Sequence, residues 1–453
     1  MQPRQDRYVL FQALYNGMIT IASVLLFPLF IYWLLTTSKR RFTFRQRMGW
    51  CRYPWQRPVT GQGPGLRCIW VHALSVGEAH AAQPLVARLR SLHPGRRICF
   101  TTSTHTGFQT AQRLFDCIEG IDLAYFPYDL IGAVRRVASK INPAMVILTE
   151  TDIWPNFLME MRRRKVPVHL INLRLSQNSW RRFSRFKRFS GALFNVFDKI
   201  AVQNPQDLKR LHSLGVSAGK VAVTGNIKFD NVTPAAEAAS AQAWKTRLGI
   251  PSERAVIVAG STHEGEEDVL IQVMKSLGSE GRRPVLVLAP RDPQRSPQLK
   301  RICTDQGLAC SLMSDLSEAI PSAGGADVVL IDAIGVLKSL YSIADVVFIG
   351  GSLVSCGGHN PLEPAELGKP ILFGPDMRDF ELIAELLTTS GGALRATGVA
   401  DMLVTIRQLL SDPESAAQMG HRALTVFRSQ QGAVDRTLKF LGLGDARDLH
   451  EKA

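Results

Sequence analysis

Short apolar runs that alternate with helix-length amphipathic segments are the feature that most constrains the fold of this chain. Runs such as VIVAG and VLVLAP are apolar throughout, which is typical of strands buried on both faces of a parallel sheet. Strands that alternate with helices predict right-handed βαβ units and a doubly wound α/β sheet. We expect strands at Cys68–His72, Arg97–Thr101, Leu123–Phe126, Ala144–Leu148, Val166–Ile171, Lys199–Val202, Ala255–Ala259, Pro284–Ala289, Val328–Ile331, Asp345–Ile349 and Pro370–Phe373.

The strand pattern divides into two parts, because it starts afresh near Ala255 after a segment rich in Ala, Gln and Lys. The ~390 residues that follow position 60 are too many for one hydrophobic core and fit two domains. We therefore predict two Rossmann-like domains that face each other across a cleft at the carboxyl ends of their sheets. The expected division is an anchor and basic linker at 1–60, a first domain at 61–240 and a second at 241–453.

Residues 8–38 contain no charged side chain and are followed at once by a cluster of Lys and Arg. At ~1.5 Å per helical residue this stretch is long enough to cross a bilayer core of ~30 Å, so we expect an N-terminal transmembrane helix. The basic flank places the remainder on the cytoplasmic side by the positive-inside rule. An amphipathic helix in the membrane interface, with Gln12 and Asn16 on its polar face, is an alternative. A cleaved signal peptide fits less well, since its apolar region is shorter and no A-x-A site follows.

The formal charge of +15, from 54 Lys and Arg against 39 Asp and Glu, predicts an anionic partner such as phospholipid head groups, a phosphorylated lipid or nucleic acid. The segment Trp180–Ser190 alternates basic and aromatic residues and is a candidate membrane dock, although a solvated helix face is the alternative. No RNP-type motif accompanies it, so nucleic acid is not expected. Seven scattered cysteines without a C-x-x-C pair predict neither a disulfide framework nor a zinc site.

Four charged residues of the expected first domain are candidates for catalysis or for supporting it. Glu78 opens a helix directly after the first strand and could act as a general base towards a hydroxyl; alternatively it only complements the helix dipole. Glu150 and Asp152 follow the fourth strand, where one of them could orient a base, and Thr151 or Asp152 could instead cap the helix near Pro155.

Lys228 follows a Gly-Asn turn near the domain boundary and could meet a carboxylate or phosphate, unless it is a solvated surface lysine.

The second half carries an anion-binding pattern rather than a G-x-G-x-x-G or Walker A motif. Arg291 ends a strand, where its guanidinium could bind phosphate oxygens. The glycine-rich segments 350–352 and 357–358 could bring backbone N–H groups to an anion. Asn360 and Glu363 then enter a helix, and one carboxylate can accept hydrogen bonds from both hydroxyls of a ribose. This set predicts a bound nucleotide, with a purely structural turn as the alternative.

A series of motifs in order along nearly the whole chain closely resembles the 3-deoxy-D-manno-octulosonic acid (Kdo) transferases of Gram-negative bacteria. The motifs are SVGE (75–78), TETDIWPN (149–156), NLRLS (172–176), VTGNIKFD (223–230), AGSTHEGEE (259–267), LAPR (288–291), the turn Gly335–Leu337 and GGHNPLEPAELGKP (357–370). The resemblance implies a GT-B fold and transfer of Kdo from CMP-Kdo to the lipid A precursor on the cytoplasmic face of the inner membrane. It implies no metal and no further cofactor.

The resemblance also implies roles for individual residues. Glu78 matches the proton acceptor that activates the acceptor hydroxyl, and Glu150 and Lys228 match positions that support the transition state. The implied CMP contacts are Pro290, Arg291, Gly335, Val336, Leu337, Asn360, Pro361, Leu362 and Glu363.

Two positions depart from the family pattern: Val336 stands where a Glu is usual, and Asp292 stands where a His usually follows the Arg. Asp292 would bring a negative charge beside the proposed phosphate ligand. A GT-B transferase that uses another nucleotide sugar, or a non-catalytic lipid- or nucleotide-binding relative, remains an alternative.

Overall fold

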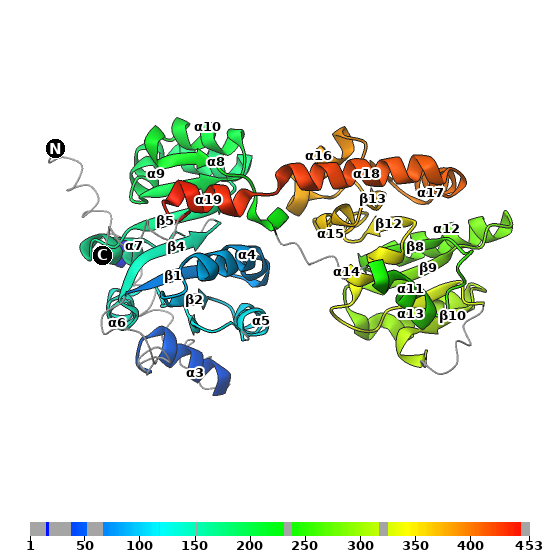
Figure 1. Ribbon diagram of the computed structural model, residues 1–453, viewed down its shortest axis with the longest axis horizontal. Coiled ribbons are helices and arrows are strands. Elements are labelled where there is room, and N and C mark those ends of the chain that lie inside the picture. Colours follow the sequence, from blue (N-terminus) through cyan, green and yellow to red (C-terminus); the bar gives the residue numbers. More distant parts are fainter. Residues whose placement is uncertain are drawn as a thin grey trace. The chain divides into compact units, whose positions relative to one another are not determined.

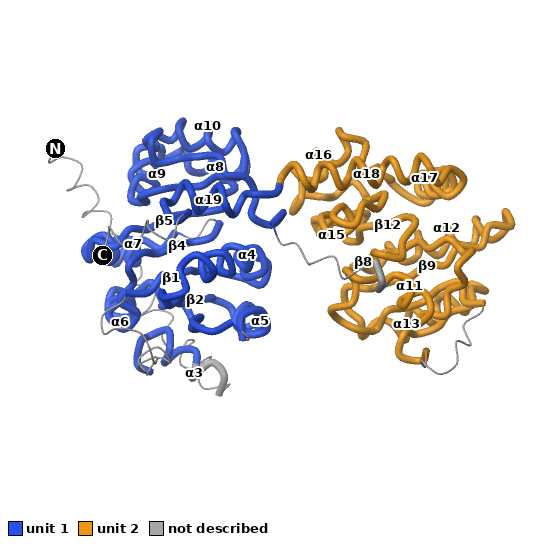
Figure 2. The backbone as a smooth tube through the Cα atoms, viewed as in Figure 1, with its two compact units in different colours: residues 1–231, 431–453 blue, residues 232–430 orange. Residues whose placement is uncertain are grey.

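The computed structural model describes residues 15–17, 38–51, 67–116, 118–150, 153–230, 238–316 and 325–444. The chain forms two compact units, which Figure 2 colours separately: unit 1 comprises residues 1–231 and 431–453, and unit 2 comprises residues 232–430. The expected second domain ran to residue 453, whereas the last helix, α19 (Ala433–Leu441), belongs to unit 1. This helix belongs to unit 1 because its Val434 and Leu438 are buried in the same hydrophobic cluster as Ile69 of the first strand.

Unit 1 is built on one sheet of seven parallel strands in the order β3-β2-β1-β4-β5-β6-β7 (Figure 1). The neighbours β1 and β4 are separated in sequence by two other strands, so the strand order reverses between them. The strands are β1 (Cys68–Ala73), β2 (Ile98–Thr102), β3 (Ile121–Tyr125), β4 (Pro143–Thr149), β5 (Val168–Leu173), β6 (Lys199–Val202) and β7 (Val221–Val223). Besides α19, its helices are α3 (Ser38–Arg47), α4 (Val76–Leu92), α5 (His105–Phe115), α6 (Ile131–Ile141), α7 (Pro155–Arg163), α8 (Gln177–Arg185), α9 (Lys187–Phe194) and α10 (Pro205–Ser213).

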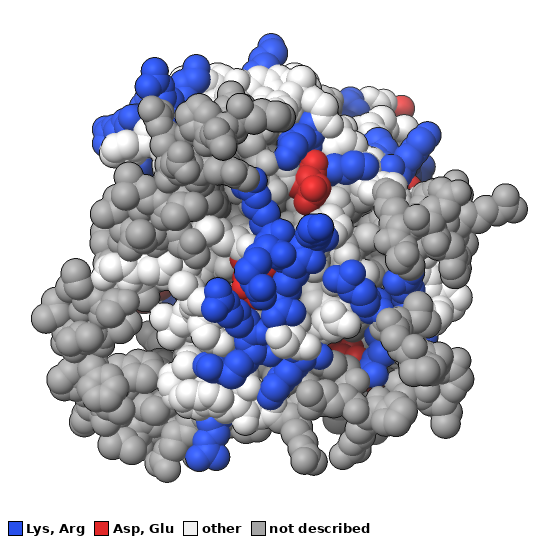
Figure 3. All heavy atoms as spheres, turned by 90° about the vertical axis from the view of Figure 1, so that its left-hand side faces the viewer, with Lys and Arg blue, Asp and Glu red and all other residues white. Residues whose placement is uncertain are grey.

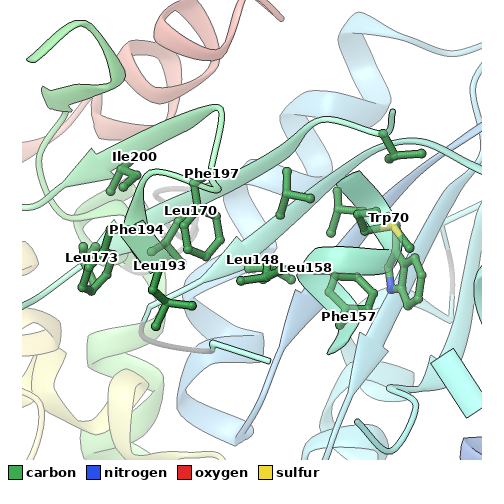
Figure 4. Packing of buried hydrophobic residues seen from close by; sticks show 14 of the residues in the cluster. Trp70, Leu148, Phe157, Leu158, Leu170, Leu173, Leu193, Phe194, Phe197 and Ile200 are labelled. Carbon is green, nitrogen blue, oxygen red and sulfur yellow. The ribbon is translucent and has the colours of Figure 1, made fainter. Parts of the chain in front are cut away.

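Both faces of the unit 1 sheet are buried, which explains why its strands read as continuous apolar runs. Successive side chains of β1 alternate between the faces. Trp70 packs with α7, where its ring lies 5.0 Å from that of Phe157 at 89° (Figure 4). Ile69 and Val71 belong instead to the cluster that contains Leu85 of α4.

Unit 2 repeats this architecture with a second sheet of seven parallel strands, in the order β10-β11-β9-β8-β12-β13-β14. Its order reverses between β8 and β12. The strands are β8 (Val256–Thr262), β9 (Val285–Pro290), β10 (Cys310–Leu312), β11 (Val328–Leu330), β12 (Val346–Ile349), β13 (Ile371–Phe373) and β14 (Ala393–Arg395). The helices are α11 (Ala238–Arg247), α12 (Glu266–Ser279), α13 (Ser296–Asp305), α14 (Leu337–Leu340), α15 (Leu362–Glu366), α16 (Glu381–Thr389), α17 (Val399–Ser411) and α18 (Pro413–Gln430).

The predicted α/β class with two parallel sheets is confirmed, and each expected strand is found within three residues of its predicted limits. Three strands of the described chain were not predicted: β7, β10 and β14. Each has three residues and lies at or beside a sheet edge, as the strand orders show. Runs this short give no periodicity that sequence reasoning could use.

The expected membrane-crossing segment, residues 8–38, lies almost entirely outside the described residues. Of the helices that the structure does describe, none is both long and apolar enough to span a bilayer, so the predicted transmembrane helix has no support there. Tyr15 donates a hydrogen bond of 2.8 Å to Asp129, and Asn16 and Asn156 exchange bonds of 2.8 and 3.0 Å. These bonds tie residues 15 and 16 to unit 1.

Candidate functional site

Glu78 lies in the first turn of α4, just after the central strand β1 ends. The residue is buried, with 8% of its surface exposed to solvent. Ser75 caps the helix and accepts a hydrogen bond from the Glu78 amide. The carboxylate turns back, so that Oε2 accepts bonds from the Leu74 amide at 2.7 Å and from the Thr149 hydroxyl at 3.1 Å. The carboxylate is therefore held in one position at the point where β1 and β4 meet. Such switch points are where open α/β sheets bind ligands.

Glu150 and Lys228 form an ion pair next to this position, with 3.1 Å between Lys228 Nζ and Glu150 Oε1. Glu150 immediately follows β4 and has a left-handed backbone with φ of 60°. A left-handed non-glycine residue costs ~1–2 kcal/mol, so the fold must compensate for this conformation. The Glu150 side chain is 29% exposed and that of Lys228 is 33% exposed, so Lys228 is not simply a solvated lysine.

The turn that carries Lys228 is fixed on both sides. Before it, the Ile227 amide donates to Asn172 Oδ1 at 3.2 Å, and Asn172 also has a left-handed backbone, with φ of 55°. After it, Asp230 accepts bonds from the amides of Gly432 and Val434, which begin α19. The C-terminal helix thus helps to position Lys228, which sequence reasoning did not predict.

Asp152 and Thr151, the other candidates after β4, lie outside the described residues. The alternative that one of them caps α7 is not needed, because Asp129 performs this role from another loop. Its two carboxylate oxygens accept bonds from the amides of Asn156 at 3.1 Å and Phe157 at 2.8 Å. A capping residue that is distant in sequence leaves no local signature.

Three segments of unit 2 that were predicted to contact a nucleotide gather at one end of its sheet. Pro290 ends β9, the turn Gly335–Leu337 begins α14, and Asn360–Glu363 leads into α15. An ion pair of 2.8 Å between Lys338 and Glu366 joins α14 to α15. Asn360 donates a 3.3 Å bond to Glu363, and burial raises the pKa of the Glu363 carboxyl, which Asn360 and Lys338 partly offset.

The glycine-rich segment 350–352 does bring its amides to an anion, but the anion belongs to the protein. Glu266, which is fully buried at the start of α12, accepts bonds from the amides of Gly351 at 2.7 Å and of Ser352 and Leu353 at 2.9 Å each. Its Oε2 also accepts the His263 amide at 2.9 Å. These amides are therefore already occupied, which corrects the prediction that they would receive a ligand.

Arg291 and Asp292 have different surroundings although they are adjacent. The Arg291 amide is bonded to Thr262 O at 2.9 Å, which fixes the residue at the end of β9, and its side chain is exposed. Asp292 caps the following 3-10 turn by accepting the Gln294 amide at 3.1 Å. The carboxylate that replaces the usual His of the motif thus has a structural partner of its own.

Lys and Arg gather on the face of unit 1 that Figure 3 shows. In Figure 1, α6 and α7 lie on this side. The predicted basic-aromatic segment 180–190 forms α8 and α9. Its Trp180, Phe183 and Phe189 pack against the core, whereas Phe186 is 69% exposed between the two helices. The exposed basic residues of this segment are Arg181, Arg182, Arg185, Lys187 and Arg188. Part of the segment therefore packs against the core, and its exposed basic residues flank the exposed Phe186 in the sequence.

No group of three or more His, Cys, Asp or Glu within the described ranges is arranged to hold a metal ion. Sequence reasoning did not single out Thr149, Asn172, Glu266 or the histidines 263 and 359. All five stand within the quoted motifs, but their roles depend on contacts between strands that are distant in sequence.

Comparison with known proteins agrees with this arrangement. Residues 42–231 match the family model of 3-deoxy-D-manno-octulosonic-acid transferase (kdotransferase). The 3-deoxy-D-manno-octulosonic acid transferase of Chlamydophila psittaci is 33% identical over 85% of this chain and 87% of its own length. That of Haemophilus influenzae is 31% identical over 91% and 95%, respectively.

Among solved structures, the UDP-GlcNAc 2-epimerase of Neisseria meningitidis bound to UDP-GlcNAc has a TM-score of 0.57 at 16% identity, and the match covers 83% of this chain and 100% of that one. A glycosyltransferase from Rickettsia africae has a TM-score of 0.54 at 11% identity, over 86% and 100%. Likeness at such identities concerns the fold alone: two parallel-sheet α/β domains of the GT-B kind.

Proposed function

Because this chain belongs to the 3-deoxy-D-manno-octulosonic acid (Kdo) transferase family, we propose that it transfers Kdo from CMP-Kdo to a hydroxyl group of the lipid A precursor. The observation that carries the proposal is the position of Glu78. Its carboxylate is buried at the carboxyl end of β1 and held by the Leu74 amide and the Thr149 hydroxyl. A general base must be fixed in this way to receive a proton from a bound alcohol.

In the proposed reaction, Glu78 takes the proton of the acceptor hydroxyl while the alcohol oxygen bonds to the anomeric carbon of Kdo. The bond between that carbon and the CMP phosphate oxygen breaks, and its electron pair leaves with CMP. Attack from the side opposite the leaving group inverts the anomeric centre. Lys228, held by Glu150 at 3.1 Å, supplies a fixed positive charge for the transition state.

Unit 2 supplies the groups proposed to bind CMP. Glu363 suits the ribose hydroxyls, since one carboxylate can accept two hydrogen bonds. Arg291 supplies an exposed guanidinium for phosphate oxygens, and the turn Gly335–Leu337 supplies backbone groups for the base. With Val336 in place of a Glu, recognition by the backbone of this turn is retained.

We place the reaction at the cytoplasmic face of the bacterial inner membrane, with the apolar residues 8–38 as its anchor. The basic face of unit 1 supports this proposal, because Lys and Arg near an anionic surface contribute about 1 kcal/mol each. The exposed Phe186 among basic side chains is the pattern expected of a residue that enters the membrane interface.

Mass spectrometry of the lipid product tests the proposal. The purified full chain, incubated with CMP-Kdo and lipid IVA, should add the mass of one or more Kdo residues and release CMP. Transfer only from a different nucleotide sugar would favour another GT-B transferase. Binding of CMP without transfer would favour a non-catalytic relative.

A further inference from the structure

His263 and His359 form a hydrogen-bonded pair in unit 2 to which the function proposed above assigns no role. Their Nε2 atoms lie 2.8 Å apart, and the planes of the two rings differ by only 5°. Two imidazole nitrogens at this distance share one proton, so one ring donates and the other accepts. The two side chains therefore act as one unit.

The pair lies where an open α/β sheet binds its ligands. His263 follows β8, and His359 lies in the loop after β12, so the pair bridges the two strands between which the strand order reverses. Arg291 follows β9, the neighbour of β8 on the other side. Three adjacent strands thus place two imidazoles and a guanidinium at the same end of the sheet.

Arg291 supplies a positive charge beside the histidine pair. Burial, the nearby Arg291 and the nearby His263 together lower the pKa of His359 to about 4. Within the described part of the chain, Arg291 forms no ion pair with a carboxylate, and the neighbouring Asp292 is bonded to the Gln294 amide. An exposed guanidinium without such an ion pair favours a bound anion.

Five amides of the adjacent loop already have acceptors within the protein. Those of Gly351, Ser352 and Leu353 are bonded to Glu266, and the Gly357 amide donates to Asp376 at 2.9 Å. The Gly358 amide donates to Gly351 O at 2.8 Å. The side chains at this position are therefore the groups that we consider for binding an anion.

The loop also makes room for the imidazole of His359. Gly351 has a left-handed φ of 69°, and a Cβ at this position would lie 3.1 Å from the His359 ring. The His359 amide is bonded to Gly350 O at 3.1 Å, which fixes its backbone against the strand end. Glycine at 351 thus permits the ring to reach His263.

We propose that His263, His359 and Arg291 together bind the phosphate group of the nucleotide sugar. This inference rests on the proposed function, and it adds two binding residues to that site. The Nε2–Nε2 bond orients both rings and leaves His359 Nδ1 available to donate to a phosphate oxygen. The Arg291 guanidinium donates to a second oxygen, and its positive charge pairs with the negative charge of the phosphate.

The test compares binding of CMP with binding of cytidine to the full-length chain by isothermal titration calorimetry. His359→Gln and His263→Gln should each weaken CMP binding by about tenfold to a hundredfold, as expected for loss of a charge-assisted hydrogen bond. Binding of cytidine, which lacks the phosphate, should stay unchanged. His421→Gln, an exposed histidine on α18 of the same unit, is the matched control and should bind both ligands as the wild type does.

Variants that keep the wild-type preference for CMP over cytidine would overturn this inference and leave the proposed function intact. An equal loss of both ligands would also overturn it, because the histidines would then support the loop rather than the phosphate. A wild-type chain that binds CMP no better than cytidine would overturn the nucleotide assignment itself, together with this subsite.

Discussion

Lys228 Nζ lies 3.1 Å from Glu150 Oε1, and two adjacent residues of β5 accept hydrogen bonds that help to fix both backbones. Glu150 has a left-handed conformation, and its amide donates a 2.8 Å bond to Ile171 O of β5. Lys228 is placed by Asn172 and by the start of α19. The ion pair therefore depends on four segments of the chain that only the fold brings together.

From this ion pair we expect that Lys228→Met and Glu150→Gln each lower the rate of Kdo transfer by about tenfold or more, since a preorganised charge is lost. The double variant should be no slower than the worse single variant, because the two residues act as a unit. Initial rates with CMP-Kdo and lipid IVA measure this effect. Lys209→Met, an exposed lysine on α10, is the control, and additive losses would contradict the prediction.

Glu78→Gln should lower transfer by at least ~10², as expected for loss of a general base, while CMP binding to unit 2 stays unchanged. Thr149→Val removes one hydrogen bond to the carboxylate and should have a smaller effect, about three- to tenfold. Single-turnover kinetics and CMP titration separate the two effects. Glu119→Gln, at an exposed position of unit 1, is the control. If Glu78→Gln transferred Kdo at the wild-type rate, Glu78 would not be the general base.

Glu266→Ala should destabilise the protein by about 3 kcal/mol or more, because four backbone amides, two of them in buried hydrogen bonds, would lose their acceptor. Chemical denaturation followed by circular dichroism measures the loss. Glu264→Ala, two residues earlier and exposed, should have little effect and serves as the matched control. Equal stability of the two variants would show that these amides find other partners.

Glu160 predicts a pH dependence of stability. Burial alone would raise the pKa of its carboxyl, but hydrogen bonds from Arg163 and Arg164 lower it to about 2. Because the folded pKa lies below the unfolded value of 4.5, the carboxylate stabilises the fold fully above pH 4.5, and this contribution is lost as the pH falls towards 2. Glu160→Gln should therefore lower the free energy of unfolding by about 1 kcal/mol at pH 7. The expected loss is this small because partners such as Arg163 are largely exposed, and solvent screens their charge.

The difference in unfolding free energy between wild type and Glu160→Gln should shrink steadily in denaturation curves recorded from pH 5 down to pH 3. A difference that stays constant over this range would contradict the assigned pKa direction. Glu119→Gln, at an exposed position of the same unit, is the control and should leave the pH dependence unchanged.

The basic segment at α8 and α9 predicts salt-sensitive binding to anionic membranes. Replacing Arg181, Arg182 and Arg185 by Gln should weaken co-sedimentation of the full chain with vesicles of anionic phospholipid, and added salt should weaken wild-type binding. Vesicles of neutral phospholipid should show little difference between the two proteins. Gln in place of Lys275, Arg282 and Arg283 of unit 2 removes the same charge elsewhere, and an equal loss there would argue against a specific surface.

The sequence predicted the strands well because a strand buried on both faces must be apolar along its length, and that pattern is local. It also placed Glu78 and Arg291 directly after strands, where the structure has them. It could not predict that Glu266 occupies the amides of the 350–352 turn, since that contact joins residues more than 80 positions apart. The position of α19 in unit 1 was hidden for the same reason.

By itself the sequence determined the two-sheet architecture, the order of the motifs and the residue types available for chemistry, since periodicity and composition are properties of the chain. Only the tertiary structure decided which of these groups meet. Thr149 reaches Glu78 and His263 bonds to His359 because neighbouring parallel strands end side by side. Lys228 pairs with Glu150 because β5 and α19 hold the turn that carries the lysine. Hydrogen bonds are short-ranged and directional, so such partners are fixed by the register and order of the strands rather than by separation along the chain.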